Sequence, residues 1–191
     1  MSSPSTPPQA SAADLASGSW RLDPDHSSVE FHVRHFYGLI TVKGHFDRYQ
    51  GSLALASEPA VQLTIDANSL ETNNAKRDKH LRSADFFDVE QTPEVRFASD
   101  SAVLEGDALR VHGKLQAAGK EVPLELDASV RAADGGLEIE AVTHADHRLL
   151  GMTWSPIGIL RAPSKLIVRG RLIRDGGEAS EQRETAETAR V

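Results

Sequence analysis

Histidine is the residue type in this sequence best suited to metal or acid–base chemistry, and the chain of 191 residues has eight copies. His32 and His35 are three residues apart in a segment with strand-like alternation, so their side chains should point to opposite faces and not chelate one ion. His144 and His147, with Asp146 between them, form a looser group. A catalytic zinc ion needs three well-placed protein ligands. We therefore interpret the histidines as surface or hydrogen-bonded residues and expect no metal site.

Motifs for nucleophilic catalysis and phosphate binding are missing from the chain. There is no cysteine, so thiolate chemistry is excluded. Neither the G-x-S-x-G turn nor the glycine-rich loops G-x-G-x-x-G and G-x-x-x-x-G-K-[ST] occur. The 28 acidic residues outnumber the 21 Lys and Arg residues, and the net charge of -7 disfavours a nucleic-acid partner. The sequence thus predicts a protein that is not an enzyme, needs no cofactor and binds no nucleic acid.

A basic run stands out in this otherwise acidic chain, because Lys76, Arg77, Lys79 and Arg82 place four permanent positive charges within seven residues. Such a patch could hold an anionic head group, helped by free amide groups at a helix start. The alternative, which we favour, is a solvated helix face whose charges pair with nearby carboxylates. The candidate carboxylates are those of Asp78, Asp85 and Asp88.

Large apolar side chains also gather near the predicted loops. They form either ordinary core, including a plug for a barrel, or the lining of a site for an apolar ligand. The residues in question are Phe36, Tyr37, Leu39, Phe86, Phe87, Leu149, Leu150, Met152, Trp154, Ile157, Ile159 and Leu160.

Alternation of apolar and polar residues with a period of two dominates residues 19–175 and predicts about eight half-buried strands. Turn-like sequences at 106–107, 118–120 and 134–136 are short enough to join antiparallel neighbours. A short helix is expected in the 74–88 region, capped by Asn73 or Asn74. Because closure removes exposed sheet edges, the predicted fold class is all-β, an eight-stranded antiparallel barrel with one short helix and room for a small ligand.

The two ends of the chain differ in composition from this alternating part. Residues 1–18 are rich in Ser, Pro, Ala and Thr and lack the charged and apolar stretches of a secretory signal, so we expect a disordered leader. Residues 176–191 open with two glycines and carry four Glu, which predicts a disordered acidic tail. No run of 18 apolar residues is present, so no transmembrane helix is expected. Residues 19–175 are the predicted folded domain.

Several motifs follow one another in a fixed order along the predicted domain. They are W-R-L-D-P-D-H-S at 20–27, F-H-V-R-H at 31–35, V-K-G-H-F at 42–46, S-L-E-T-N-N at 69–74, R-D-K-H-L-R-S-A-D-F-F-D at 77–88 and P-E-V-R-F at 93–97. In this order the motifs resemble those of the YceI-like family, the lipocalin-like polyisoprenoid-binding proteins of bacteria. The resemblance extends from Trp20 to Arg174.

The resemblance implies an extended lipocalin-like barrel with an isoprenoid quinone, a polyprenyl phosphate or a similar lipid threaded through an apolar pore. Burial in a dry pore stabilises such a tail by about 25 cal/mol per Å² of apolar surface. Strand parity and position in the family motifs together predict the ligand-binding residues. They are Val29, Phe31, Val33, Phe46, Val95 and Phe97 in the pore, Phe86, Phe87, Met152, Trp154 and Ile157 nearer an end, and His35, Arg77 and His80 at a polar mouth.

The implied protein is a non-catalytic carrier or sequestering protein for this lipid. Periplasmic members of the family carry signal peptides, and residues 1–18 do not resemble one, so we expect this protein in the cytoplasm. The resemblance also favours a homodimer. Two alternatives stay open. One is an interaction module whose barrel is filled by its own side chains, and the other is a lipid-modifying enzyme with His35, His80 and Asp78 as acid and base at the mouth. Arg77 could instead lock the helix to the barrel rim through ion pairs.

Overall fold

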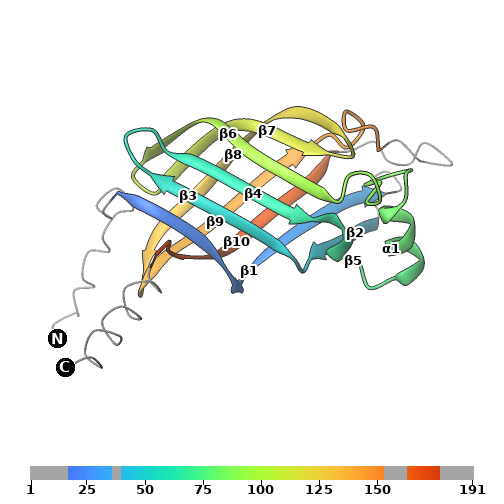
Figure 1. Ribbon diagram of the computed structural model, residues 1–191, viewed down its shortest axis with the longest axis horizontal. Coiled ribbons are helices and arrows are strands. Elements are labelled where there is room, and N and C mark those ends of the chain that lie inside the picture. The colour runs from blue at the N-terminus through green and yellow to red at the C-terminus, as the bar shows by residue number, and fades with distance from the viewer. Residues whose placement is uncertain (1–16, 36–39, 153–162, 177–191) are drawn as a thin grey trace, which may run out of the picture.

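The computed structural model describes residues 17–35, 40–152 and 163–176 (Figure 1). These ranges contain ten strands, one 3-10 turn (Ala67–Ser69) and one α-helix. The elements are β1 (Gly18–His35), β2 (Ile40–Phe46), β3 (Tyr49–Leu55), β4 (Ala60–Asp66), β5 (Leu70–Glu71), α1 (Ala75–Arg82), β6 (Glu94–Glu105), β7 (Ala108–Ala117), β8 (Lys120–Ala133), β9 (Gly136–Ala145) and β10 (Ser164–Arg174).

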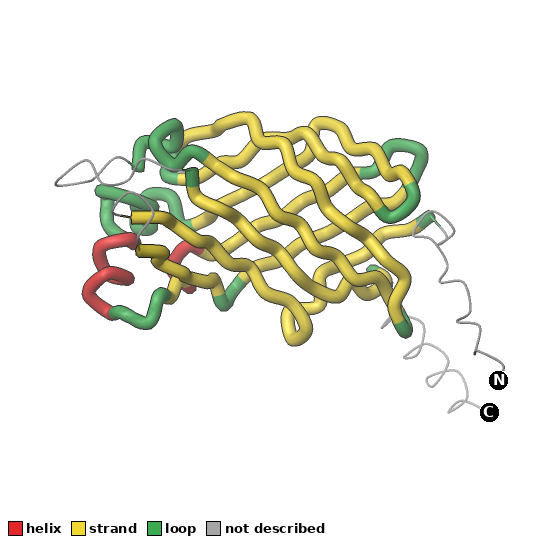
Figure 2. Tube along the Cα trace, turned by 180° about the vertical axis from the view of Figure 1, so that it is seen from behind, coloured by secondary structure: helices red, strands yellow, loops and turns green. Residues whose placement is uncertain are grey.

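Eight of the strands close into a ring. Its order is β1, β3, β4, β6, β7, β8, β9 and β10, and β10 pairs back onto β1. Neighbours in the ring run antiparallel, and the strands cross the long axis of the barrel at a slant (Figure 2). The closed ring confirms the predicted eight-stranded antiparallel barrel, and it leaves no open edge within the ring.

One edge of β1, which is 18 residues long, pairs with two different strands. Its start, Gly18–Arg21, pairs with β3, whereas 29–35 pairs with β2. The other edge of β1 pairs with β10, and the register of this pairing shifts between Leu22 and Ser27. Strands β2 and β5 therefore lie outside the ring. They extend the sheet at the end of the barrel where α1 lies (Figure 1).

The helix begins where its capping residue predicts. The Asn74 side chain accepts a hydrogen bond of 3.1 Å from the Arg77 backbone N–H, which satisfies one free amide of the first turn. Asn73 instead adopts a positive φ of 60° just before the cap. The helix ends at Arg82, with Ser83 as C-cap, so it is shorter than the 74–88 region.

Three hairpins of the barrel use two-residue turns at the predicted places, between Glu105 and Ala108, Ala117 and Lys120, and Ala133 and Gly136. Tight turns of this kind need positive φ angles, which glycine adopts without strain. In the second turn Gly119 has φ 70°, but the residue before it, Ala118, also has a positive φ of 49°. An alanine pays a steric cost in this conformation.

Replacing Ala118 by asparagine should therefore stabilise the protein. Asn-Gly is a preferred pair for this turn, and the expected gain in the free energy of unfolding is about 0.5–1 kcal/mol. Urea unfolding of Ala118→Asn beside Ala118→Val checks this. The valine variant should be less stable than the wild type, because a β-branched residue is disfavoured at positive φ, and a stabilising valine would contradict the turn geometry.

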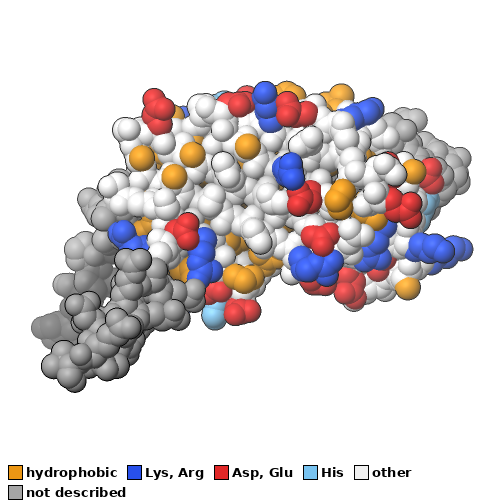
Figure 3. Space-filling model, in the orientation of Figure 1, with side chains coloured by type: hydrophobic (Ala, Val, Ile, Leu, Met, Phe, Trp, Pro, Cys, Tyr) orange, Lys and Arg blue, Asp and Glu red, His pale blue; other side chains and the backbone are white. Residues whose placement is uncertain are grey.

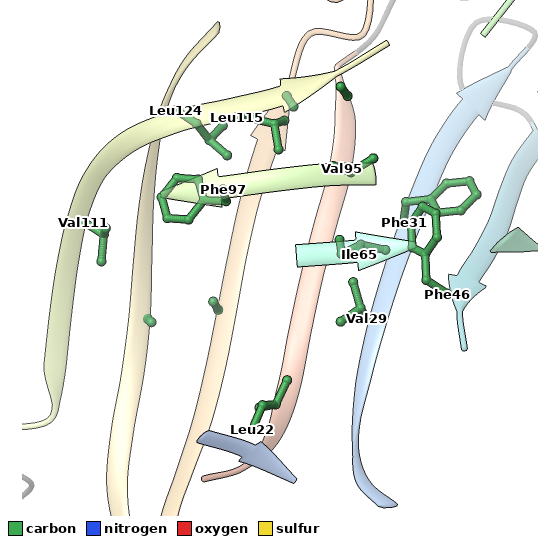
Figure 4. Close-up of a cluster of buried hydrophobic side chains, with 14 of the residues drawn as sticks. Leu22, Val29, Phe31, Phe46, Ile65, Val95, Phe97, Val111, Leu115 and Leu124 are labelled. Atoms are coloured by element: carbon green, nitrogen blue, oxygen red, sulfur yellow. The ribbon is translucent and has the colours of Figure 1, made fainter. Parts of the chain in front are cut away.

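The interior of the barrel is apolar and the exterior is mixed. Strand β7 shows the pattern clearly, since every second residue from Leu109 to Ala117 is buried. Inward side chains from several strands converge in Figure 4. On the outer face shown in Figure 3, acidic and basic side chains are interspersed without a large single-sign patch.

Candidate functional site

An apolar cavity lies inside the barrel, and each of the eight ring strands contributes to its lining. Its volume is about 170 Å³, compared with about 10–15 Å³ for one water molecule on the same measure. Apolar cavities of such size stay dry and take up apolar ligands. The barrel therefore encloses a cavity suited to an apolar ligand.

Small side chains on one wall create this space. Ala117 on β7, Ala128 on β8, and Ala141 and Ala145 on β9 all line the cavity. Ala128 and Ala141 are also direct partners in the β8–β9 register, so two methyl groups stand side by side where larger residues would fill the interior. The cavity is thus a product of residue size on neighbouring strands.

Aromatic rings form the wall near α1. The Phe31 and Phe46 ring centroids are 5.5 Å apart, and Phe87 meets Phe46 edge-on at 6.0 Å. Gly44 lies opposite Phe31 in the β1–β2 register, and a Cβ atom there would come within 2.3 Å of the Phe31 ring. The glycine of the V-x-G-x-F motif therefore makes room for the ring that borders the cavity.

A polar pair lies at one end of the cavity. After β9 the chain turns through 146–152, where Met152 N–H donates to the His147 carbonyl at 3.1 Å. His147 is buried in the lining together with Ser164, the first residue of β10. The Ser164 Oγ and His147 Nδ1 atoms are 3.4 Å apart. The apolar cavity thus ends in a hydroxyl and an imidazole.

An ion pair outside the cavity holds this turn. Arg148 donates to Asp146 through Nε at 2.8 Å and through Nη2 at 2.6 Å. These hydrogen bonds lower the pKa of the Asp146 carboxyl to about 2. Asp146 therefore stays ionised and paired through the physiological pH range, while His147 points inward.

The structure places half of the residues proposed for ligand binding in the lining, and contact of all of them with a ligand stays a prediction. The seven in the lining are Val29, Phe31, Phe46, Phe87, Val95, Phe97 and Met152. Val33 and Phe86 pack against the core outside the lining. His35 ends β1 and pairs with Ile40, and its side chain lies outside the described part, as do Trp154 and Ile157. The leader before residue 17 and the tail after residue 176 also lie outside the described residues.

The two arginines of the basic run bind the segment just before α1. Arg77 donates to the Thr72 hydroxyl through Nε and to the Thr72 carbonyl through Nη2, both at 2.7 Å. Arg82 donates to the carbonyls of Asn68, at 3.0 Å, and Leu70. His80 is 3.0 Å from Asp85 and packs edge-on against Phe86. Arg77 and His80 lie outside the cavity lining, and both arginines tie α1 to the segment before it.

Buried Asp78 completes this connection. Its Oδ1 accepts from the Thr72 backbone N–H at 3.0 Å and from the Thr72 hydroxyl at 2.5 Å. We expect Asp78→Ala to lower the free energy of unfolding by about 2 kcal/mol, because buried donors lose a charged acceptor. Asp85→Ala is the control, since Asp85 is exposed and its pair with His80 should contribute less than about 1 kcal/mol. Equal effects in thermal unfolding would contradict this role of Asp78.

One group among the described residues has the donor atoms for a metal ion. His45, Asp47 and Glu71 bring their ligand atoms within 4.8 Å of one another at the β2–β5 edge. Asp47 and Glu71 are exposed, and His45 is 3.2 Å from Asp47 as an ordinary surface pair. In the loose group of His144, Asp146 and His147, the His144 side chain is exposed and the His147 side chain is buried.

Sequence reasoning missed part of the lining. The alternation in β7 and β8 could have identified Leu109, Val111 and Leu124, whose inward parity the pattern contains. His147 and Ser164 carried no such signal, because neither lies within an alternating stretch: His147 follows β9, and Ser164 is the first residue of β10.

The described residues thus form a closed eight-stranded antiparallel barrel around an apolar cavity. Residues 20–168 match the family model of the YceI-like domain, and the chain belongs to this family. A UPF0312 protein of Pectobacterium atrosepticum is 35% identical over 127 residues, 63% of this chain and 66% of that protein. Protein YceI of Salmonella arizonae is 36% identical over 117 residues, 58% of this chain and 61% of that protein. The match covers less than two thirds of either relative.

Solved structures share the fold at low identity. BcnA of Burkholderia cenocepacia superposes with a TM-score of 0.72 at 16% identity, covering 79% of this chain and 98% of that chain. A polyisoprenoid binding domain from Saccharophagus degradans, implicated in plant cell wall breakdown, gives a TM-score of 0.63 at 13% identity, covering 84% and 100%. None of the helices in the described part of this chain has the length and apolar character needed to cross a bilayer.

Proposed function

We propose that this protein binds a long isoprenoid-type lipid in its barrel and carries or sequesters it without chemical change. The observation that carries the proposal is the apolar cavity of about 170 Å³ lined from every strand of the ring. A tail that enters it exchanges water for apolar side chains, and each buried CH₂ contributes about 0.8 kcal/mol. The polyisoprenoid binding domain that shares the fold supports the same class of ligand.

The residues around the cavity favour binding over catalysis. Ser164 and His147 have the types of a nucleophile and a base, but a hydrolase also needs a group that orients the base and donors that stabilise an oxyanion. The one carboxylate among the described lining residues is Glu30 on β1, and it faces Ser28 at 3.2 Å and Arg169 at 3.8 Å. This arrangement supports a carrier.

Thermal unfolding tests the proposal. A twenty-carbon isoprenoid alcohol present at about a hundred times its Kd should stabilise the protein by about 2.7 kcal/mol. For a chain of this size the midpoint should rise by roughly 5–10 °C. A five-carbon alcohol with the same head is the control and should produce no such rise. If the long tail also leaves the midpoint unchanged, the self-filled interaction module becomes the better account.

Location in the cytoplasm and a homodimer are further parts of the proposal. The described surface exposes two large apolar side chains, Val103 at 55% and Leu149 at 63%. Cell fractionation and light scattering on the eluting protein measure the two properties directly. A periplasmic pool would contradict the cytoplasmic location, and a monomeric mass would contradict the homodimer. Neither result would contradict lipid binding.

A further inference from the structure

Three metal-ligating side chains meet where β2 pairs with β5. His45 on β2 and Glu71 on β5 are direct partners in the antiparallel register, so their side chains lie on the same face of the sheet. Asp47 follows β2, and its Oδ1 atom is 3.2 Å from the His45 Nε2 atom. One ligand atom from each of the three residues lies within 4.8 Å of the others. Phe46 lines the apolar cavity, so its neighbour His45 points away from that cavity.

The geometry of this group suits a transition-metal ion. The ligand atoms of tetrahedral zinc lie about 2.1 Å from the metal, and therefore about 3.4 Å from one another. The distance between His45 and Asp47 is already close to this value. Glu71 is exposed and can close the remaining distance by a change of rotamer. One imidazole nitrogen with two carboxylate oxygens suits Zn²⁺, whereas Mg²⁺ and Ca²⁺ take oxygen ligands.

Strand β5 holds Glu71 in a fixed place beside β2. The carbonyl of Leu70, the residue before it, accepts a hydrogen bond from Arg82. The backbone N–H of Thr72, the residue after it, donates to the buried Asp78 carboxylate at 3.0 Å. Helix α1 therefore anchors the chain on both sides of Glu71. A ligand on a fixed backbone loses less conformational freedom when an ion binds.

Charge and space around His45 also favour a cation. Glu30 is its partner in the β1–β2 register, so His45 has a glutamate opposite it on each neighbouring strand. A polar hollow of about 390 Å³ borders His45 and Asp47, and it leaves room for water at an open metal position. Lys43 lines the same hollow, but its single positive charge stands against the carboxylates of Glu30, Asp47 and Glu71.

We propose that His45, Asp47 and Glu71 bind one divalent transition-metal ion of the zinc type, which links β5 to β2. The two strands share two residue pairs, so the ion would fasten a short pairing at the end of the sheet where α1 lies. The site is separate from the apolar cavity and does not depend on lipid binding. Spacing along the chain does not indicate it, because the β2–β5 pairing brings Glu71 to His45.

Calorimetric titration of the full-length protein, without a histidine tag, tests the site with Zn²⁺ as the probe. The wild type should bind one Zn²⁺ per chain. His45→Ala and Glu71→Gln should each weaken binding at least about tenfold, since even the loss of a residue that only supports a metal ligand lowers affinity about 10–100-fold. His112→Ala is the matched control, because exposed His112 faces one carboxylate, Glu125 at 3.3 Å, across a strand pair. It should bind Zn²⁺ like the wild type.

Amide hydrogen exchange followed by NMR locates the ion. Saturating Zn²⁺ should slow exchange in β2 and β5 and leave the β7–β8 hairpin unchanged, and Glu71→Gln should lose this protection. A wild type that binds no Zn²⁺, or His45→Ala and Glu71→Gln variants that bind it as tightly as the wild type, would overturn the proposal. Equal affinity of the wild type for Mg²⁺ and Zn²⁺ would also overturn it, because carboxylates alone would then account for the binding.

Discussion

An Ala141→Phe variant should lose isoprenoid binding while keeping its fold. Ala141 lines the cavity beside Ala128, and a phenyl ring at this position would occupy much of the 170 Å³ that the tail needs. Each five-carbon isoprene unit that is excluded forfeits about 4 kcal/mol, at roughly 0.8 kcal/mol per carbon. Affinity for a twenty-carbon isoprenoid alcohol should therefore fall at least about a hundredfold.

The same variant separates binding from stability. Filling an existing cavity adds apolar contacts, so the ligand-free protein should unfold at or above the wild-type midpoint. Ala98→Phe places the same ring at an exposed position on β6 and should bind lipid like the wild type. Titration and thermal unfolding of both variants give the comparison. Full lipid affinity in a folded Ala141→Phe protein would show that the tail binds elsewhere.

Gly113→Ala should be the most destabilising of the simple substitutions considered. Gly113 faces inward on β7 beside a bulge between Ser99 and Ser101, and a Cβ atom would come within 2.3 Å of the Ala98 carbonyl oxygen and 2.8 Å of the Phe97 ring. The carbonyl belongs to the backbone and cannot rotate away. We expect the free energy of unfolding to fall by about 3 kcal/mol.

Gly51→Ala provides the matched control for this prediction. Gly51 borders the cavity, and a Cβ atom there would meet its nearest neighbours, Leu22 and Leu63, at an ordinary 3.4 Å. Its effect should stay within about 1 kcal/mol, with some gain from a less flexible unfolded chain. Urea unfolding of both variants decides the matter, and a Gly113→Ala protein as stable as Gly51→Ala would contradict the close packing at the bulge.

Parity predicted the inward side of several strands, but it carries no information on depth along the barrel. Phe31, Val95 and Phe97 point inward as their alternation indicates. Val33 has the parity of Phe31, but it pairs with Val42 in the β1–β2 extension beyond the ring. Its side chain packs against the core outside the cavity, because the strand continues past the enclosed space.

The pairing of one edge of β1 with both β3 and β2 could not be predicted from the sequence. Alternation identifies a strand but not its neighbours, and the shift at 22–27 is visible only in the pairing with β10. The cavity has the same origin in tertiary structure. Its space depends on Ala128 and Ala141 being register partners, which no local pattern of either strand specifies.

The polar end of the site illustrates a further limit. From the sequence, His147 belonged to a loose group with His144 and Asp146. The structure directs His147 inward because the turn after β9 is fixed by the Asp146–Arg148 ion pair and by the bond from Met152 to the His147 carbonyl. Ser164 comes close through the β9–β10 pairing, which is again a tertiary event.

Native mass spectrometry of the protein purified from its own host, followed by organic extraction of the bound material, tests the central claim most directly. We expect a stoichiometric complex that releases one lipid per barrel, with an isoprenoid tail. A protein that is found at its ligand-free mass, and that takes up no added isoprenoid, would contradict the claim that the barrel is a lipid-binding site.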